Sequence, residues 1–356
     1  MATGMKSVKT APFTLRKGGQ EFLEGAERLA QSLQRVSLDQ VFAEANRKAV
    51  RRKPSRAWGA MGEKPVDWFV FEEGDDTTEK WYPQGVSCAP GAGTDGGPAF
   101  AVSWYWKPEP QQTERGVRVS LLDAATAVYR HALLVAALPD GSFGPIDIHA
   151  GGIAWHKGLL YVADTFRGLR VFDMDRVLDM RTGRDHVGDE DKIGWVDGEP
   201  HAYNYRYVIP QIGHWRVAEQ GARFSFAAVD GSGDRDLLIS GEYVSGDSPR
   251  GRVARWALGE DGHLIADDTG TATAVDAYRL PDKKIQGALS HRGRWYFSRS
   301  AGSRSNGTLI VVPENGPHVR RRYPIGPEDL TCLPEEGTLW SVTEYPGRRT
   351  LFAVRL

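Results

Sequence analysis

The sequence predicts an all-β protein made of a repeated unit of short strands, and three observations lead to this prediction. They are the amino-acid composition, an internal repeat, and the incomplete last copy of that repeat. The 356 residues include 41 glycines, 20 prolines and 11 tryptophans, which indicates many tight turns between short, aromatic-rich strands. The hydrophobic fraction of 40% can form a substantial core in a chain of this length.

The N-terminal part of the chain differs from the rest and is expected to contain two short helices. Residues 20–34 place their apolar side chains on one helical face. A second helix is expected to begin at Ser37, because Gln40 follows at the capping-box spacing. After residue 65 the pattern changes to short strands separated by turns. We therefore expect an N-terminal extension at 1–65, packed on a strand domain at 66–356.

An internal repeat organises the strand region. Each copy has a short apolar strand, a glycine turn, a longer apolar strand and then a third strand. The clearest copies begin near Gly152, Gly287 and Asp329, and two looser copies begin near Gly85 and Ser225. Fourth strands are expected at residues 132–137, 205–209, 274–280 and 318–323.

The last copy of the repeat is incomplete, because the chain ends at Leu356 directly after the third strand. Residues 67–71, just before the first copy, can supply the missing strand. Such an exchange between the two termini closes a ring and removes an open sheet edge. The sequence therefore predicts a five-bladed β-propeller. A six-bladed ring and a sandwich with an irregular meander are the alternatives. The closing strand is expected at 66–72, and the blades are expected to start near residues 84, 149, 223, 286 and 328.

One blade contains three segments that support a narrower comparison than the propeller fold in general. It contains HAGGIAW at 149–155, YVADT at 161–165 and GLRVFD at 168–173. In these segments the chain resembles uncharacterised actinobacterial propeller proteins. The resemblance implies a bacterial propeller and brings no known activity with it.

The charge and the N-terminal segment limit the classes of partner. Lys and Arg total 45 against 46 Asp and Glu, a net charge of −1, so no overall field favours nucleic acid or an anionic membrane. Residues 1–19 lack the apolar stretch of a signal peptide, and no run of 18 apolar residues occurs. We expect a cytoplasmic monomer, or a secreted one if a leader has been removed.

Neither a disulfide framework nor a metal or cofactor is expected. Cys88 and Cys332 are the only cysteines, and their matched positions in the repeat favour small buried side chains. His149 and His214 could join a glutamate in a mixed metal site, but no close ligand spacing indicates one. Phosphate-loop, dinucleotide and HExxH motifs do not occur.

The candidate site is the upper face of the ring, where the inner strands begin and the second strands end. Each blade places a different polar or aromatic residue there, which favours one asymmetric pocket over repeated sites. The inner-strand starts are Gln84, His149, Arg223, Gln286 and Glu328, and the second-strand ends are Trp104, Asp164, Glu242, Arg299 and Glu344. Loops after fourth strands are expected to add Trp81, His214 and Trp215.

Acid–base catalysis on a small molecule is the first function hypothesis. Glu328, Glu344, Glu242 and Asp164 could crowd one funnel, and like charges at short range raise the pKa of one carboxyl. A protonated carboxyl can then donate a proton to a hydrolase, lyase or cyclase substrate. Glu328 or Glu344 is the expected acid, with His149 as the base or as a group that orients it. For a hydrophobic lyase or cyclase substrate, the expected pocket walls are Trp81, Trp104, Tyr105 and Trp215.

Three alternatives to catalysis remain open for the same residues. The propeller could bind a carbohydrate or another small ligand without turning it over, through Trp and Tyr faces and the polar residues named above. It could be a protein-interaction scaffold. Single residues of the set could also be paired only for structural reasons, as Arg223 and Arg299 would be if they neutralise neighbouring carboxylates.

Overall fold

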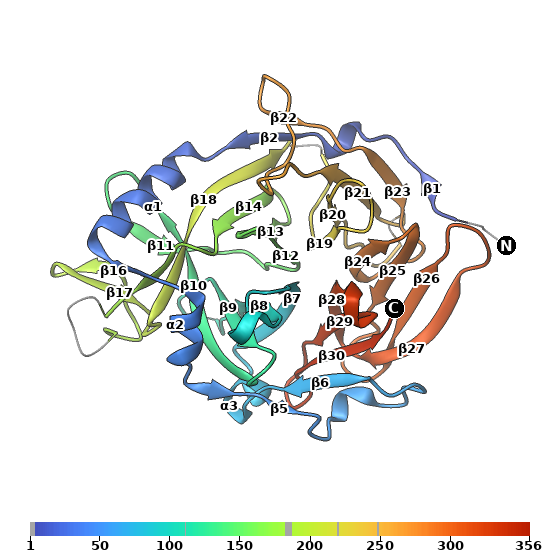
Figure 1. Cartoon of the computed structure of the whole chain (residues 1–356), viewed down its shortest axis with the longest axis horizontal. Coiled ribbons are helices and arrows are strands. Elements are labelled where there is room, and N and C mark those ends of the chain that lie inside the picture. The colour runs from blue at the N-terminus through green and yellow to red at the C-terminus, as the bar shows by residue number, and fades with distance from the viewer. Residues whose placement is uncertain (1–3, 111, 182–186, 219–220, 248) are drawn as a thin grey trace.

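The protein is a five-bladed β-propeller, as the sequence predicts. The computed structural model describes residues 4–110, 112–181, 187–218, 221–247 and 249–356. Four-stranded antiparallel units are arranged around a central axis, with β7, β12, β19, β24 and β28 nearest the centre (Figure 1). Each blade runs from its innermost strand outward, as in other propellers.

The blades are numbered here from 1 to 5 in chain order. Blade 1 contains β7 (Trp81–Ala89), β8 (Ala99–Trp106), β9 (Val117–Asp123) and β10 (Val128–Ala137). Blade 2 contains β12 (Ile153–His156), β13 (Leu159–Asp164), β14 (Gly168–Asp173) and β18 (Tyr207–Val217). Blade 3 contains β19 (Phe226–Asp230), β20 (Leu237–Gly241), β21 (Arg252–Ala257) and β23 (Asp276–Arg279). Blade 4 contains β24 (Ile285–His291), β25 (Arg294–Arg299), β26 (Asn306–Val312) and β27 (Val319–Ile325). Blade 5 contains β28 (Pro327–Leu333), β29 (Thr338–Thr343), β30 (Thr350–Arg355) and β6 (Asp67–Val70).

The two ends of the chain close the ring in blade 5. Strand β6 pairs antiparallel with β30, with Val70 opposite Thr350 and Asp67 opposite Ala353. The outermost strand of the last blade therefore comes from the N-terminal part of the chain. This confirms closure by an N-terminal strand and removes the edge that β30 would otherwise expose.

The N-terminal segment, residues 6–58, forms an outer belt around the ring (Figure 1). Four of its short strands pair with outer strands of blades 3, 2, 1 and 5 in turn, and its last 3₁₀ turn contacts β27 of blade 4. The long helix α1 (Gln20–Ser32) lies against β18 and β10. The division into an extension at 1–65 and a domain at 66–356 stays a prediction. The remaining belt elements are β1 (Lys6–Ser7), η1 (Ala11–Phe13), β2 (Leu15–Gly18), β3 (Gln34–Val36), α2 (Leu38–Ala43), β4 (Arg47–Lys48), β5 (Val50–Arg51) and η2 (Arg56–Trp58).

Short elements decorate the loops between these strands. The loop elements are α3 (Glu73–Thr77), η3 (Thr94–Gly96), β11 (Phe143–Pro145), β15 (Val177–Asp179), β16 (Ile193–Val196), β17 (Glu199–Ala202), β22 (Thr271–Ala272) and η4 (Pro334–Glu336).

The outer strand of blade 2 is much longer than the 205–209 segment that the sequence predicts. It has partners along its whole length, because β10 pairs with its first part in parallel and β2 pairs with its last part. Ala132 lies opposite Tyr207, and Gly18 lies opposite His214. The belt therefore extends this strand as far as Val217.

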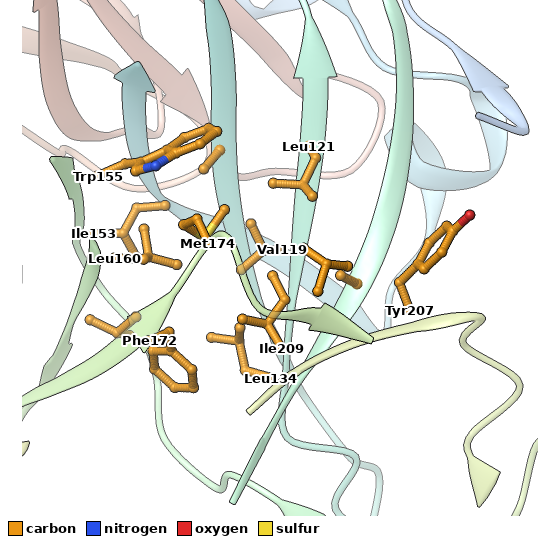
Figure 2. Packing of buried hydrophobic residues seen from close by; sticks show 14 of the residues in the cluster. Val119, Leu121, Leu134, Ile153, Trp155, Leu160, Phe172, Met174, Tyr207 and Ile209 are labelled. Carbon is orange, nitrogen blue, oxygen red and sulfur yellow. The ribbon is translucent and has the colours of Figure 1, made fainter. Parts of the chain in front are cut away.

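The hydrophobic core lies between neighbouring blades. Figure 2 shows the cluster between blades 1 and 2, where Leu121 and Val119 of β9 face Leu160 and Phe172 of blade 2. The faces of adjacent sheets pack against one another around the ring, so each blade shares its core with both neighbours.

Glycines at the axis let the inner strands approach one another. A Cβ at Gly152 would lie 2.1 Å from the backbone nitrogen of Ala227, and one at Gly287 would lie 2.7 Å from the Cα of Asp329. Blade 5 has Asp329 at the corresponding place. Its Oδ2 accepts a hydrogen bond from the backbone N–H of Ile153 at 3.0 Å and from that of Val86 at 3.4 Å. This carboxyl therefore links the inner strands of blades 5, 2 and 1.

Candidate active site

Two glutamates meet at the upper end of the axis and are called here the carboxyl pair. Glu328 lies in β28 and is only 1% exposed, and Glu344 directly follows β29. Their side chains are neighbours close enough to influence each other's ionisation. Two like charges at short range oppose each other's ionisation, so the pair favours a state that retains a proton.

Burial is the main reason why the pair retains that proton. It raises the pKa of Glu328 well above its usual range, and the charge of Glu344 raises it further. Burial also raises the pKa of Glu344, although hydrogen bonds from Tyr345 and Gln84 oppose this shift. The two groups titrate together, and the last proton leaves the pair only well above the pKa of an ordinary glutamate.

Two glutamine amides hold the pair from opposite sides. Gln84 Nε2 donates to Glu344 Oε2 at 3.0 Å, and Gln286 Nε2 donates to Glu328 Oε1 at 2.9 Å. These neutral donors orient the carboxyl groups without supplying a positive charge. Four residues that the sequence places at the mouth therefore lie together, two as the pair and two as its clamps.

A β-bulge occurs at three of these four residues. The register of each inner strand shifts at Gln84 in β7, at Gln286 in β24 and at Glu328 in β28. Such β-bulges turn a side chain away from the regular alternation of the strand. The three bulged residues are members of the carboxyl pair or its clamps, and we call the region around these four side chains the mouth.

The stacked rings of Tyr105 and His149 lie beside the carboxyl pair. The ring of Tyr105 lies close enough to the glutamates for their charges to raise its pKa, although burial is the larger cause. His149 stacks on Tyr105 with ring centroids 4.2 Å apart. Burial lowers the pKa of His149, and the charge of Asp147 opposes that shift. His149 is therefore neutral at pH 7 and able to accept a proton.

Arg349 also belongs to this site, although the sequence pattern did not single it out. It is fully buried and donates from Nε to the backbone oxygen of Glu344 at 2.9 Å. Its guanidinium lies 5.0 Å from the centroid of Tyr82, and burial lowers its pKa to about 10. Arg349 is in the loop that follows the second strand of blade 5. A charged residue shortly after a second-strand end is therefore the signal that could have found it.

Four other predicted residues have partners other than the carboxyl pair. Asp164 is paired with Arg170 at 2.9 Å, and Glu242 is paired with Arg252 at 2.6 Å. Both carboxylates thus form local ion pairs within their own blades. The two remaining arginines also have local contacts: Arg223 lies over Phe166 with 5.2 Å to the ring centroid, and Arg299 lies 3.4 Å from Asp282.

The predicted tryptophans and His214 have partners of their own elsewhere in the blades. Trp104 is fully buried and donates from Nε1 to Ser120 Oγ at 2.8 Å, and Trp81 is buried against Trp106. The placement of Trp81, His214 and Trp215 in loops is wrong, because Trp81 begins the inner strand β7 and the other two lie within the long β18 beside the outer belt. The extension of β18 by its belt partner moves them to the outer rim.

Within the part of the chain that the structure describes, no group of three or more His, Cys, Asp or Glu side chains could hold a metal ion. No helix among the described ranges is long and apolar enough to cross a membrane.

Comparisons with known proteins give similarity to solved structures alone. No protein-family model and no curated protein matches this chain. The chain is similar to the GH43_1 enzyme from Xanthomonas citri, at 12% identity and a TM-score of 0.37, with 93% of each chain covered. It is also similar to CoXyl43, a GH43 β-xylosidase/α-arabinofuranosidase from a compost microbial metagenome, at 13% identity and a TM-score of 0.36. This match covers 86% of the present chain and 95% of the other. A glucose dehydrogenase structure matches at 13% identity and a TM-score of 0.31, covering 72% of this chain and 77% of that one. At this level the similarity assigns no activity.

Proposed function

We propose that this protein is an enzyme that hydrolyses a small-molecule substrate by acid–base catalysis at the mouth of the propeller. The observation that carries the proposal is the meeting of Glu328 and Glu344 in a buried site, where Gln84 and Gln286 each hold one of the two carboxyl groups. Nearby lies a histidine whose pKa is shifted in the opposite direction. Titratable groups whose environments move their pKa values apart are typical of an acid and a base with separate roles.

The carboxyl pair is the proposed general acid. Its two groups adjoin and influence each other's ionisation, whereas the two carboxyls of glycosidases work as separate groups about 5 Å apart in retaining enzymes and about 6.5–9.5 Å apart in inverting ones. Glu328 and Glu344 therefore act as one unit that gives a proton to the leaving group, with the remaining negative charge shared between them. The base must then be a different residue.

His149 is the proposed base. Being neutral, it takes a proton from the attacking water as the new bond to oxygen forms. The bond to the leaving group breaks at the same time, and the leaving oxygen receives the proton of the carboxyl pair. Transfer of the histidine proton to solvent, and uptake of one by the pair, restores the starting state. Tyr105, stacked on His149, keeps the imidazole ring in position.

The first test measures turnover in Glu328→Gln and Glu344→Gln with a panel of p-nitrophenyl glycosides and esters. Each substitution removes one titratable carboxyl group of the pair but keeps a side chain that fits the amide clamp. Loss of general acid catalysis should lower kcat by about 10²- to 10⁴-fold. Glu336→Gln is the matched control, because Glu336 is exposed in a turn of the same blade and should leave kcat unchanged.

Two outcomes would contradict the proposal. One is an active wild-type protein whose kcat is unchanged by both substitutions at the pair. The other is turnover of a substrate in ¹⁸O-labelled water without uptake of the label, which would point to a lyase or cyclase. The pH profile gives a further check. The rate should fall at high pH as the pair loses its proton, and at low pH as His149 gains one.

A ligand-binding propeller without catalysis is the second candidate. It is favoured by Phe166, a large apolar side chain that is 72% exposed beside the mouth. In this case a ligand would bind with unchanged affinity to wild type and to Glu328→Gln, and no panel compound would be turned over.

A further inference from the structure

A pocket of about 500 Å³ opens beside the mouth, between loops of blades 1 and 2. Its volume is within the range of sites that hold a small ligand. Tyr105 and His149 form part of its lining, so it shares a wall with the mouth. Glu328 and Glu344 do not line it. A molecule that reacts at the carboxyl pair could therefore extend into this pocket past the stacked Tyr105 and His149 rings.

Phe166 forms another flat wall of the pocket, in the turn between β13 and β14. Its 72% exposure is the largest among the exposed large hydrophobic side chains of the described residues. The guanidinium of Arg223 lies 5.2 Å from the ring centroid and braces the ring. Pockets that bind small ligands are typically lined by aromatic side chains, and this ring lines the pocket with its surface largely uncovered.

The polar part of the lining is balanced in charge. Lys107 and Arg167 supply positive charge, and Glu114 and Asp147 supply negative charge. Asp164 also lines the pocket, but its carboxylate is neutralised by Arg170. Such a lining contains both hydrogen-bond donors and acceptors. It has no net charge that would attract an anionic or a cationic ligand.

We infer that this pocket is a subsite for a neutral polyhydroxylated ring, that is, a sugar unit of the substrate. The flat apolar face of the ring lies against Phe166, and its hydroxyl groups bond to the charged side chains on the other walls. This inference rests on the proposed function and names its substrate class. The reacting bond lies at the carboxyl pair, and the pocket holds the neighbouring, non-reacting unit.

The test measures binding of methyl β-D-glucopyranoside, xylobiose and cellobiose by saturation-transfer NMR and calorimetry. At least one of these sugars should bind to wild type and to Glu328→Gln. Loss of the aromatic face in Phe166→Ala should weaken that binding about tenfold. Phe166→Tyr should restore the affinity. Trp195→Ala is the control, because Trp195 is an exposed aromatic residue outside this pocket.

The inference is overturned if none of the three sugars binds, or if Phe166→Ala and wild type bind equally well. Failure of the proposed function gives a different result. In that case a sugar binds, Phe166→Ala weakens it, and no hydrolysis of any panel substrate occurs. Tight binding of glucuronate or glucose 6-phosphate together with no binding of the neutral sugars would identify an anion site and reject the neutral ring.

Discussion

Two buried carboxyl clusters of this propeller have opposite charge states. Asp75 of α3 is 4% exposed at the outer side of blade 1, and Glu328 is 1% exposed at the mouth. Burial opposes ionisation of Asp75, but His131, the charge of Arg118 and the hydroxyl of Tyr129 hold its pKa well below its usual range. Glu328 has a second carboxyl and a neutral amide as neighbours, and its pKa is raised.

The difference between the clusters is in the partners, because the burial is similar. Asp75 accepts hydrogen bonds from Arg118 Nη2 at 2.7 Å and from the Tyr129 hydroxyl at 2.6 Å, and His131 Nε2 lies at 3.0 Å. The cationic partner Arg118 stabilises the ionised carboxylate of Asp75, and this ion pair stabilises the folded state. A neutral amide and a like-charged neighbour leave a carboxyl that retains its proton and can donate it.

Asp75, His131 and Ser120 are connected in the order of an Asp–His–Ser catalytic triad. Ser120, however, is not accessible to a substrate. Ser120 Oγ lies 3.0 Å from His131 Nδ1 and accepts a hydrogen bond from Trp104 Nε1. Ser120 has no exposed surface. We therefore assign this cluster to the stability of blade 1, where it joins α3 to β9 and β10.

The largest expected effect is the loss of protein stability when the Asp75 cluster loses its carboxylate. Asp75→Asn leaves Arg118 buried without its counter-charge, so the free energy of unfolding should fall by about 3–5 kcal/mol. Urea denaturation measures the change. Glu73→Gln, an exposed substitution on the same helix, is the control. A loss no larger than that of the control would show that Asp75 does not lock the fold.

The clusters should also give opposite pH dependences. Burial lowers the pKa of His131 to about 3, so the folded state resists protonation of this histidine. The free energy of unfolding should therefore decrease as the pH falls below about 6.5, the pKa of an unfolded histidine. Asp75 adds a loss below its ordinary pKa of 3.8. In urea titrations, His131→Gln should show a smaller first decrease, with a remainder from other histidines whose pKa is lowered by burial, such as His149, and an unchanged curve would contradict the assignment.

The smallest expected effect is a gain in protein stability at pH 8 when the Glu328 carboxyl is replaced by an amide. The raised pKa of Glu328 means that folding favours its protonated form, so its contribution to stability is lost as the pH rises above 4.5. Glu328→Gln keeps the shape of the protonated group and should increase the free energy of unfolding at pH 8 by about 0.5–2 kcal/mol. Thermal unfolding of this variant beside Glu336→Gln measures the gain. A decrease would mean that the pair stabilises the ring.

Much of this architecture could be predicted from local pattern. The repeat of short strands and glycine turns predicts five blades, and the missing last strand predicts the pairing of β6 with β30. The site was only partly predictable. Four carboxyl groups were expected to crowd one funnel, and Glu328 and Glu344 are the two that lie together, at positions that the blade register places on one face of the ring. Asp164 and Glu242 occupy positions equivalent to Glu344, yet an arginine one strand away pairs with each of them.

The sequence by itself determined the blades, the closure and the positions from which side chains could reach the mouth. These depend on alternation of apolar residues and on turns, which act over a few neighbouring residues. Only the tertiary structure decided which of those side chains would meet. The clamping of Glu344 by Gln84 joins residues from the two ends of the ring. The belt strand opposite His214 carries that residue to the rim. Such contacts depend on closure of the ring, which no local segment of the sequence contains.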